Sequence, residues 1–274
     1  MLGCIKKDLY LLFHKKAFLI ILIGITLLLS YMSLNGISSA YYAGRSYQNF
    51  FFMMLNYTKH AFMSFFFLLI PLLVVFPFAD TWLHEQYMTD VIFTRVTRKK
   101  YFLSKYLISF ISGFIVIFIP LVVSYCSVIL ALDFNDNVLN IVQATANETN
   151  IEAFLSNYTF YQIYLENPYM FIFIFIFLIS IFGGFCAVTA FSISLVVKQK
   201  VIAYIGMFLF LIVEMLVIGN LPVPFGYYNI QNIIQPDTRI VIEPIVYIVW
   251  LGIFLIINIV LYYVFCRRTA YERA

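Results

Sequence analysis

The sequence predicts an all-α integral membrane protein, and three observations lead to this fold class. Hydrophobic residues make up 64% of the chain and charged residues only 11%, whereas a soluble domain has about 25% charged residues. The apolar residues form runs of about eighteen or more, the length at which a helix crosses a bilayer. The basic residues gather in loops on one side of these runs. A single membrane domain therefore covers residues 1–274.

Six membrane spans are predicted along the chain. They cover residues 17–34, 61–79, 106–132, 169–197, 201–219 and 244–265. Pro71 and Pro77 in the second span and Pro120 in the third each remove a helix hydrogen bond and favour a kink. Because the number of spans is even, both termini are expected on the same side of the membrane.

The orientation follows from the lysines and arginines, which accumulate in cytoplasmic loops. Fourteen of the seventeen lie on one side: Lys6, Lys7, Lys15, Lys16, Arg95, Arg98, Lys99, Lys100, Lys105, Lys198, Lys200, Arg267, Arg268 and Arg273. The other side holds Arg45, Lys59 and Arg239 together with seven acids. Both termini are therefore predicted to be cytoplasmic. This asymmetry accounts for the net charge of +4, and nucleic-acid binding is not needed to explain it.

The first segment, residues 1–16, has the spacing of an amphipathic helix. Leu2, Ile5, Leu9, Leu12 and Phe13 recur at helical intervals, with Lys6, Lys7 and Asp8 between them. A helix lying in the inner headgroup layer is favoured. The alternative is an extended, lysine-flanked start to the first span.

Two loops are predicted on the outer side before the fourth span. Loop 35–60 is rich in aromatic residues, which favour the membrane interface. Loop 133–168 is the longest, and a short amphipathic helix is expected within it, with Asn150 as cap and Pro168 as stop. Its apolar face would consist of Ile151, Phe154, Leu155, Tyr158 and Leu165.

The third outer connection, residues 220–243, is predicted to be a broken, re-entrant segment between the fifth and sixth spans. Pro222, Pro224, Gly226 and Pro236 prevent a continuous helix there. Two short pieces dipping into the outer leaflet would fit, provided that their backbone is buried in protein or faces water.

Motifs for catalysis and cofactor binding are absent from the sequence. No glycine is followed by lysine, so the phosphate-binding G-x-x-x-x-G-K-[ST] loop cannot form. His84-Glu85 resembles the start of a zinc H-E-x-x-H motif, but residue 88 is Met. We therefore expect no catalytic site, no metal and no cofactor in this chain.

Glu214 is the one acid inside a predicted span, about five residues from the outer end of the fifth span. Ionisable residues within membranes usually face protein or water and are functional candidates. A substrate or gating role is one interpretation of Glu214. The other is a carboxylate near the interface that a neighbouring group satisfies.

Loop 80–105 is the one long charged segment between two spans. After a cap at Asp80 or Thr81, apolar and basic residues recur every four positions as Leu83, Tyr87, Val91 and Arg95. A short amphipathic helix followed by a basic elbow is predicted. Contact with anionic lipid headgroups would explain Arg98, Lys99 and Lys100. It would not explain the acids Asp80, Glu85 and Asp90 in the same loop.

The chain resembles the ABC type-2 exporter permeases over essentially its whole length. The strongest part is Glu85 to Lys105, where an acid, a short helix, the pair Thr97-Arg98 and a lysine entering the third span are similar to the family pattern. The chain departs from that pattern at Thr89, where many relatives have Gly, and in its longer outer loop.

The resemblance implies that the helix of loop 80–105 is a coupling helix, seated in a groove of a separate ATPase subunit that binds ATP and Mg. A second permease copy or a related permease would complete twelve spans. The residues implied as the ATPase contact are Trp82, Leu83, His84, Glu85, Tyr87, Met88, Thr89, Val91, Arg95 and Arg98, with Lys198, Gln199 and Lys200 as a second inner contact.

The expected function is export of an amphipathic peptide, lipid or hydrophobic drug across the bacterial cytoplasmic membrane, with Glu214 at the border of the substrate path. The alternative is an ATPase-independent membrane protein, either an ion-coupled carrier or a stand-alone immunity protein. Ion-coupled carriers usually show internal repeats and several charges within their spans. This sequence has one such acid and no evident repeat.

Overall fold

The computed structural model describes residues 2–42, 61–131, 159–197, 199–222, 225–234 and 242–271, and within these ranges the chain is helical and contains no strand. Five of the helices are long and apolar enough to cross a membrane. They are α2 (Lys16–Tyr42), α7 (Arg98–Ala131), α11 (Pro168–Val196), α12 (Lys200–Gly219) and α14 (Pro244–Tyr271). The all-helical, membrane-like character predicted from the sequence is confirmed to this extent.

The other elements are shorter and lie before, between or after the long helices. They are α1 (Leu2–His14), α4 (Ala61–Val75), α5 (Thr81–Glu85), η2 (Gln86–Met88), α6 (Thr89–Arg95), α10 (Tyr161–Glu166), η3 (Phe225–Tyr228) and α13 (Ile230–Ile234). Helix α1 lies within the predicted interfacial segment 1–16. Helices α11, α12 and α14 begin within one residue of the predicted fourth, fifth and sixth spans.

The second predicted span, 61–79, differs from the structure in length. Helix α4 has 15 residues and measures about 22 Å at 1.5 Å per residue, less than a hydrocarbon core of about 30 Å. Residues 76–80 form turns, in which Ala79 N donates to Val75 O at 3.1 Å. Pro77 falls in these turns and not in a helix. Six full-length spans are therefore not present among the described residues, and the second predicted span is a shorter apolar helix.

Two helices extend beyond their predicted spans. Helix α2 continues to Tyr42, but its part that is apolar enough to cross a membrane, Lys16–Ser33, agrees with the predicted span 17–34. Helix α7 begins at Arg98, eight residues before the predicted start of the third span at 106. The basic residues that were expected to form an elbow are the first two turns of α7, because Lys, Arg and Leu are good helix formers. Pro168 was expected to stop the outer helix, and α10 ends at Glu166, two residues before it. Pro168 is then the first residue of α11, where its missing N–H costs nothing.

The expected outer helix around residues 150–165 lies mostly outside the described residues. The described part contains α10 and the N-cap of α11, where Asn167 accepts a hydrogen bond from Met170 N at 3.1 Å. Phe160, just before α10, has the positive φ of 62°.

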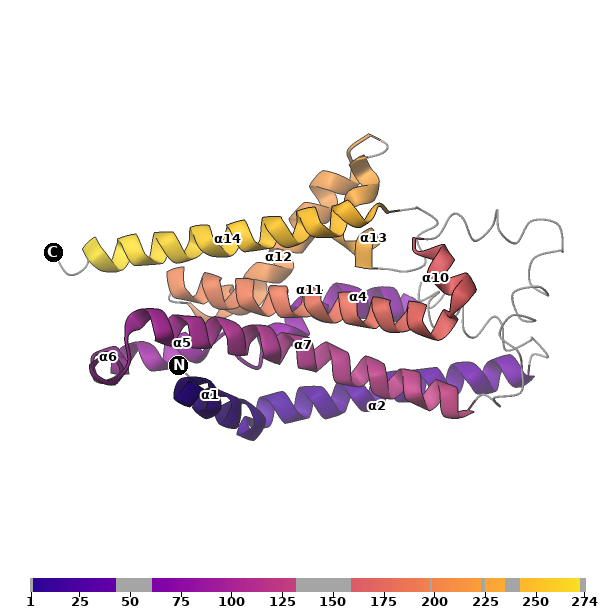
Figure 1. The fold of residues 1–274 in the computed structure, drawn as a ribbon, viewed down its shortest axis with the longest axis horizontal. Helices are drawn as coiled ribbons and strands as arrows, with labels where there is room; N and C mark the ends of the chain where they lie inside the picture. The colour runs from indigo at the N-terminus through magenta and orange to yellow at the C-terminus, as the bar shows by residue number, and fades with distance from the viewer. Residues whose placement is uncertain are drawn as a thin grey trace.

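The helices run side by side around α11 (Figure 1). Helix α11 contacts α7, α14, α12 and α4, while α2 packs on α7. Helices α1, α5 and α6 lie at the same end of the bundle as the C-terminal part of α14, and α10 and α13 lie towards the opposite end (Figure 1). Helix α1 and the C-terminal part of α14 thus lie at one end of the bundle, and the number of membrane crossings stays a prediction. Which side of the membrane this end faces stays a prediction.

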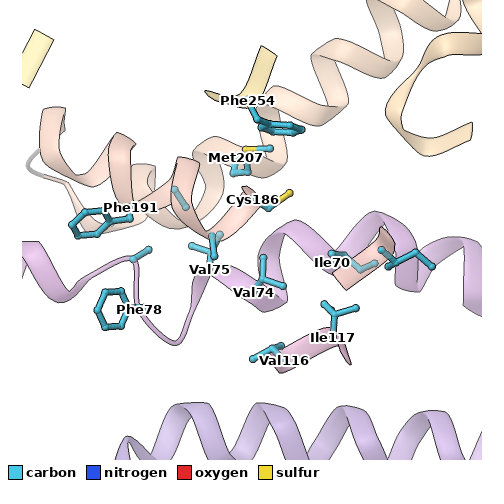
Figure 2. Packing of buried hydrophobic residues seen from close by; sticks show 14 of the residues in the cluster. Ile70, Val74, Val75, Phe78, Val116, Ile117, Cys186, Phe191, Met207 and Phe254 are labelled. Carbon is cyan, nitrogen blue, oxygen red and sulfur yellow. The ribbon is translucent and has the colours of Figure 1, made fainter. Parts of the chain in front are cut away.

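The core is a cluster of apolar side chains to which most of the helices contribute, and Figure 2 shows part of it. The buried residues labelled there include Ile70 and Val74 of α4, Ile117 of α7, Phe191 of α11 and Met207 of α12. Within a bilayer the lipid is as apolar as these side chains, so close packing and hydrogen bonds hold the helices together more than burial does.

Polar side chains within the long helices are paired across helix contacts. Asn258 of α14 lies 2.5 Å from Ser192 of α11 through its Oδ1 and donates through Nδ2 to Thr189 Oγ1 at 3.1 Å. On the other side of the bundle, Ser33 of α2 lies 2.5 Å from Ser124 of α7. These pairs fix α14 on α11 and α2 on α7 at defined heights.

Helices α7 and α11 approach each other most closely where Gly113 faces Gly183. A Cβ atom on Gly113 would lie 2.6 Å from both Gly183 O and Ala187 Cβ. Neither neighbour is the flexible end of a side chain, so a methyl group would have to push the helices apart. The small residues of α11 that the sequence shows are therefore used for packing.

We expect Gly113→Ala to destabilise the protein by about 1–3 kcal/mol, the usual cost of overpacking. The matched control is Gly24→Ala in α2, where nothing lies within 4 Å of the new methyl group. The control should be neutral or slightly stabilising, since Ala exceeds Gly in helix propensity by about 1 kcal/mol. Thermal loss of the monodisperse peak of the detergent-solubilised protein measures both. Equal stability of the two variants would contradict the close contact.

Candidate functional site

The segment that the sequence singles out, residues 80–98, folds as two short helices joined by a turn. Helix α5 ends at Glu85, the 3-10 turn η2 follows, and α6 ends before the extended residue Val96, whose φ is −138° and ψ 133°. A single amphipathic helix was expected, so this prediction is wrong in detail. The break at residues 86–88 places Leu83 and Val91 on different faces. Of these two residues, Leu83 is buried and Val91 is exposed.

The side of this segment that faces the helix bundle packs in an aromatic cluster. Trp82 of α5 packs against Phe102 of α7 and Phe265 of α14, with ring centroids 5.4 and 5.3 Å apart. Phe93 of α6 packs edge-on against Tyr101 of α7 at 5.7 Å. The two short helices are thereby attached to two of the long helices.

A charge cluster formed by Asp8, Glu85 and Lys105 lies beside the aromatic cluster. Asp8 and Lys105 are buried, and Glu85 is partly buried. Lys105 Nζ lies 3.0 Å from Asp8 Oδ1 and 2.8 Å from Glu85 Oε1, and the lysine is only 1% exposed. Tyr101 donates to Glu85, and Ser104 donates to the second oxygen of Asp8 at 3.4 Å. The ammonium group also lies over the Tyr101 ring at 5.3 Å. One lysine thus joins α1, α5 and α7.

The sequence did not reveal the role of Asp8. It was placed among the polar residues of an interfacial helix, but it is buried and faces α7. Its position provides a signal, because Ile5, Asp8, Leu9 and Leu12 follow the i, i+3, i+4, i+7 pattern of a single helix face. An acid inside an apolar stripe indicates a buried partner of opposite charge.

A second ion pair joins the start of α5 to the turn between α1 and α2. Lys15 Nζ donates to Asp80 Oδ1 at 2.7 Å, and His84 Nε2 lies 3.2 Å from Asp80 Oδ2. Burial raises the pKa of Asp80. The hydrogen bond and the charge of Lys15, together with Tyr204 and His84, lower this pKa by more than burial raises it. The net effect holds the pKa of Asp80 below its ordinary value.

The side of the segment that faces away from the helix bundle carries three exposed apolar residues. Tyr87 is 88% exposed, Met88 65% and Val91 64%. Arg95 and Arg98 are exposed next to them, and the Arg98 guanidinium lies 5.2 Å above the Phe93 ring. We call Tyr87, Met88 and Val91 the apolar tip.

The predicted contact residues are therefore divided between two sides of the segment. Trp82, Leu83 and Glu85 face inwards, whereas Tyr87, Met88, Val91, Arg95 and Arg98 are exposed. His84 is exposed and lies 3.3 Å from Lys200 Nζ of α12, which brings the predicted second inner contact close to the first. Gln199 is also exposed, Thr89 begins α6, and Lys198 lies outside the described residues.

Glu214 lies at the other end of the bundle. It is 7% exposed, and its Oε1 accepts a hydrogen bond from Ile230 N at 3.0 Å. Trp250 of α14 donates to Tyr228 O at 3.0 Å, so the return segment η3–α13 is tied to both α12 and α14. The predicted break between the fifth and sixth spans is present in the described parts of 220–243. The carboxylate is used by a neighbouring backbone group, and a role in a substrate path stays a prediction.

The described ranges contain no cluster of three or more His, Cys, Asp or Glu side chains able to hold a metal ion. Paired charges and aromatic contacts characterise the end of the bundle where α1, α5 and α6 lie.

We expect Lys105→Met to destabilise the protein by about 3–5 kcal/mol, because it leaves the buried Asp8 and the partly buried Glu85 without their counter-ion. Lys99→Met, a change of the same kind at an exposed residue, should stay within about 0.5 kcal/mol of the parent. Denaturant unfolding of the detergent-solubilised protein compares the two. Similar stabilities would mean that the charge cluster contributes nothing.

The lowered pKa of Asp80 predicts a pH dependence. The native state keeps this carboxylate ionised at pH values where the unfolded chain, with a pKa of about 3.9, is already protonated. The stabilising contribution is therefore fully present above about pH 4 and is lost as the pH falls through the folded pKa. The parent should be more stable than Asp80→Asn at neutral pH, and the difference should shrink on acidification. A difference that is constant from pH 7 to pH 3 would contradict this.

Comparison with known proteins finds no protein-family model, no curated protein and no solved structure that matches this chain. Function therefore has to follow from the residues themselves and from the way the described helices arrange them.

Proposed function

We propose that this chain is the membrane-spanning permease subunit of an ATP-driven exporter of the ABC type-2 class, in the bacterial cytoplasmic membrane. It would have six spans with both termini in the cytoplasm. A separate ATPase subunit would bind ATP and Mg, and a second permease copy or a related permease would complete the transporter. The cargo would be an amphipathic peptide, lipid or hydrophobic drug.

The observation that carries this proposal is the apolar tip on a firmly anchored segment. Apolar side chains with Arg nearby are typical of the centre of a protein interface. Tyr87, Met88 and Val91 are exposed, although the same short segment buries Trp82 and Leu83. A protein groove that covers the tip would remove this apolar surface from water.

The position of the tip would suit a soluble subunit. Helix α6 lies at the extreme end of the bundle, beyond the start of α7 (Figure 1), and α7 begins with the charged residues Arg98, Lys99 and Lys100. A subunit that approaches this end would meet the tip.

The connections of the segment support a role in transmitting movement. Trp82 and Phe93 bind it to α7 and α14, and Glu85 binds it through Lys105 to α1. A force on the tip would therefore reach three helices through buried contacts. Such a rigid attachment suits a segment that passes the closure of an ATPase to the membrane helices.

The partner permease and the cargo have apolar surface available to them. Helices α2, α12 and α14 keep many exposed apolar side chains, among them Leu27, Leu209 and Ile248. These faces would meet lipid or the second permease. An amphipathic cargo fits such surfaces better than a hydrophilic solute would.

The test is co-purification of ATPase subunits from the source cell with this chain. Tyr87→Ala combined with Met88→Ala should reduce the bound ATPase at least about tenfold, as expected for the centre of an interface. Tyr10→Ala is the matched control, because Tyr10 is an exposed aromatic residue on α1 at the same end. Glu85→Arg is a poor probe, since Glu85 is paired with Lys105 and its reversal would disturb folding.

Native preparations that contain no ATPase would overturn the proposal and favour an ion-coupled carrier or an immunity protein. An ATPase that binds the double variant as well as it binds the parent would place the contact elsewhere on the inner end. ATP hydrolysis by the reconstituted complex, measured with and without the tip residues, distinguishes lost binding from lost coupling.

A further inference from the structure

A pocket with a cavity volume of about 60 Å³ lies between α11, α13 and α14, away from the end of the bundle where α1, α5 and α6 lie. Helices α11 and α14 diverge towards the end where α13 lies between them (Figure 1). They are held together by Asn258 and Ser192, closer to the end where α1, α5 and α6 lie. The residues lining the pocket are Leu178, Ile181, Phe182, Phe185, Ile230, Ile233, Tyr247, Trp250, Leu251 and Phe254.

The pocket has a rigid aromatic wall. Phe254 is 2% exposed, and its ring centroid lies 5.9 Å from that of Phe182, 6.0 Å from Phe185 and 6.3 Å from Trp250. Ile230 and Ile233 of α13 are also buried. These contacts fix the shape of the pocket.

The polar side-chain atoms of the lining are already used within the chain. Tyr247 OH donates to Ile233 O at 3.3 Å, and Trp250 Nε1 donates to Tyr228 O at 3.0 Å. The backbone N–H of Ile230 donates to Glu214. A polar ligand group would find no partner on these atoms and would lose its own hydration. The occupant must therefore be hydrocarbon.

We propose that this pocket binds a single acyl chain of a membrane lipid. Its cavity volume of about 60 Å³ is far below the roughly 300–1,000 Å³ of sites that enclose a drug-sized ligand, so the pocket has room for part of one slender chain and not for a bulky molecule. Both α11 and α14 are apolar enough to cross a membrane, so the hydrocarbon around the pocket is lipid. The inference rests on the membrane location in the proposed function and does not depend on ATP-driven export.

Tryptophan fluorescence can test this proposal, because the chain has only two tryptophans, Trp82 and Trp250. In a Trp82→Phe variant, Trp250 alone reports on the pocket. The purified full chain is placed in phosphatidylcholine vesicles containing a rising fraction of phosphatidylcholine with brominated chains, which quench a tryptophan on contact.

The reference is a variant with Trp82→Phe, Trp250→Phe and Ile248→Trp. Ile248 is 67% exposed, lies two residues from Trp250 and does not line the pocket. Its tryptophan reports on ordinary lipid contact at nearly the same depth. Half-maximal quenching of Trp250 should occur at a fraction of brominated lipid at least about threefold lower than for this reference.

The second part of the experiment fills the pocket with a larger side chain. Ile181→Phe in the Trp82→Phe background should move the Trp250 curve to the reference curve, while Ile248→Phe should leave it unchanged. Leu178→Phe replaces Ile181→Phe if gel filtration shows that the latter is misfolded. Coincident curves for Trp250 and the reference, absence of Trp250 quenching, or no effect of filling would each overturn the proposal. Because no ATPase is present, none of these results bears on export.

Discussion

The end of the bundle where α1, α5 and α6 lie depends on one buried ammonium group. Lys105 is almost inaccessible and satisfies Asp8 of α1 and Glu85 of α5 together. A lysine in this position is costly unless its partners are present, and each carboxylate is costly without the lysine. The cluster thus requires α1, the short helices of residues 81–95 and α7 to be in place together. The aromatic contacts of Trp82 and the exposure of the apolar tip follow from this arrangement.

Hydropathy and charge predicted most of the helical framework, because these signals are local. The helices α11, α12 and α14 begin within one residue of their predicted spans. The four-residue repeat of Leu83, Tyr87 and Val91 predicted a single helix, which is wrong because a turn at 86–88 interrupts it. The partners of Lys105 could not be predicted, because Glu85 lies 20 positions and Asp8 lies 97 positions from it along the chain. Such pairings are decided by tertiary packing, which a single sequence does not display.

Polar groups are paired differently at the two ends of the bundle: by ion pairs at one end, and by hydrogen bonds between side chains and the backbone at the other. At the opposite end Glu214 is matched with a backbone N–H of α13, and Trp250 with a backbone carbonyl. Non-helical backbone near a membrane must be satisfied by protein or water, and these side chains supply part of what the return segment needs. The same pairings leave the wall beside them apolar. Stabilising the broken segment and creating a hydrocarbon pocket are therefore two results of one set of hydrogen bonds.

The charge cluster also constrains how this sequence can change over evolutionary time. A single replacement of Asp8, Glu85 or Lys105 passes through a protein with an uncompensated buried charge or an unpaired polar group. Neutral drift at one of the three positions is therefore blocked unless another position changes with it. Descendants of this chain would keep the three residues as a group or lose them as a group, whereas the exposed Lys99 and Lys100 nearby are free to vary one at a time.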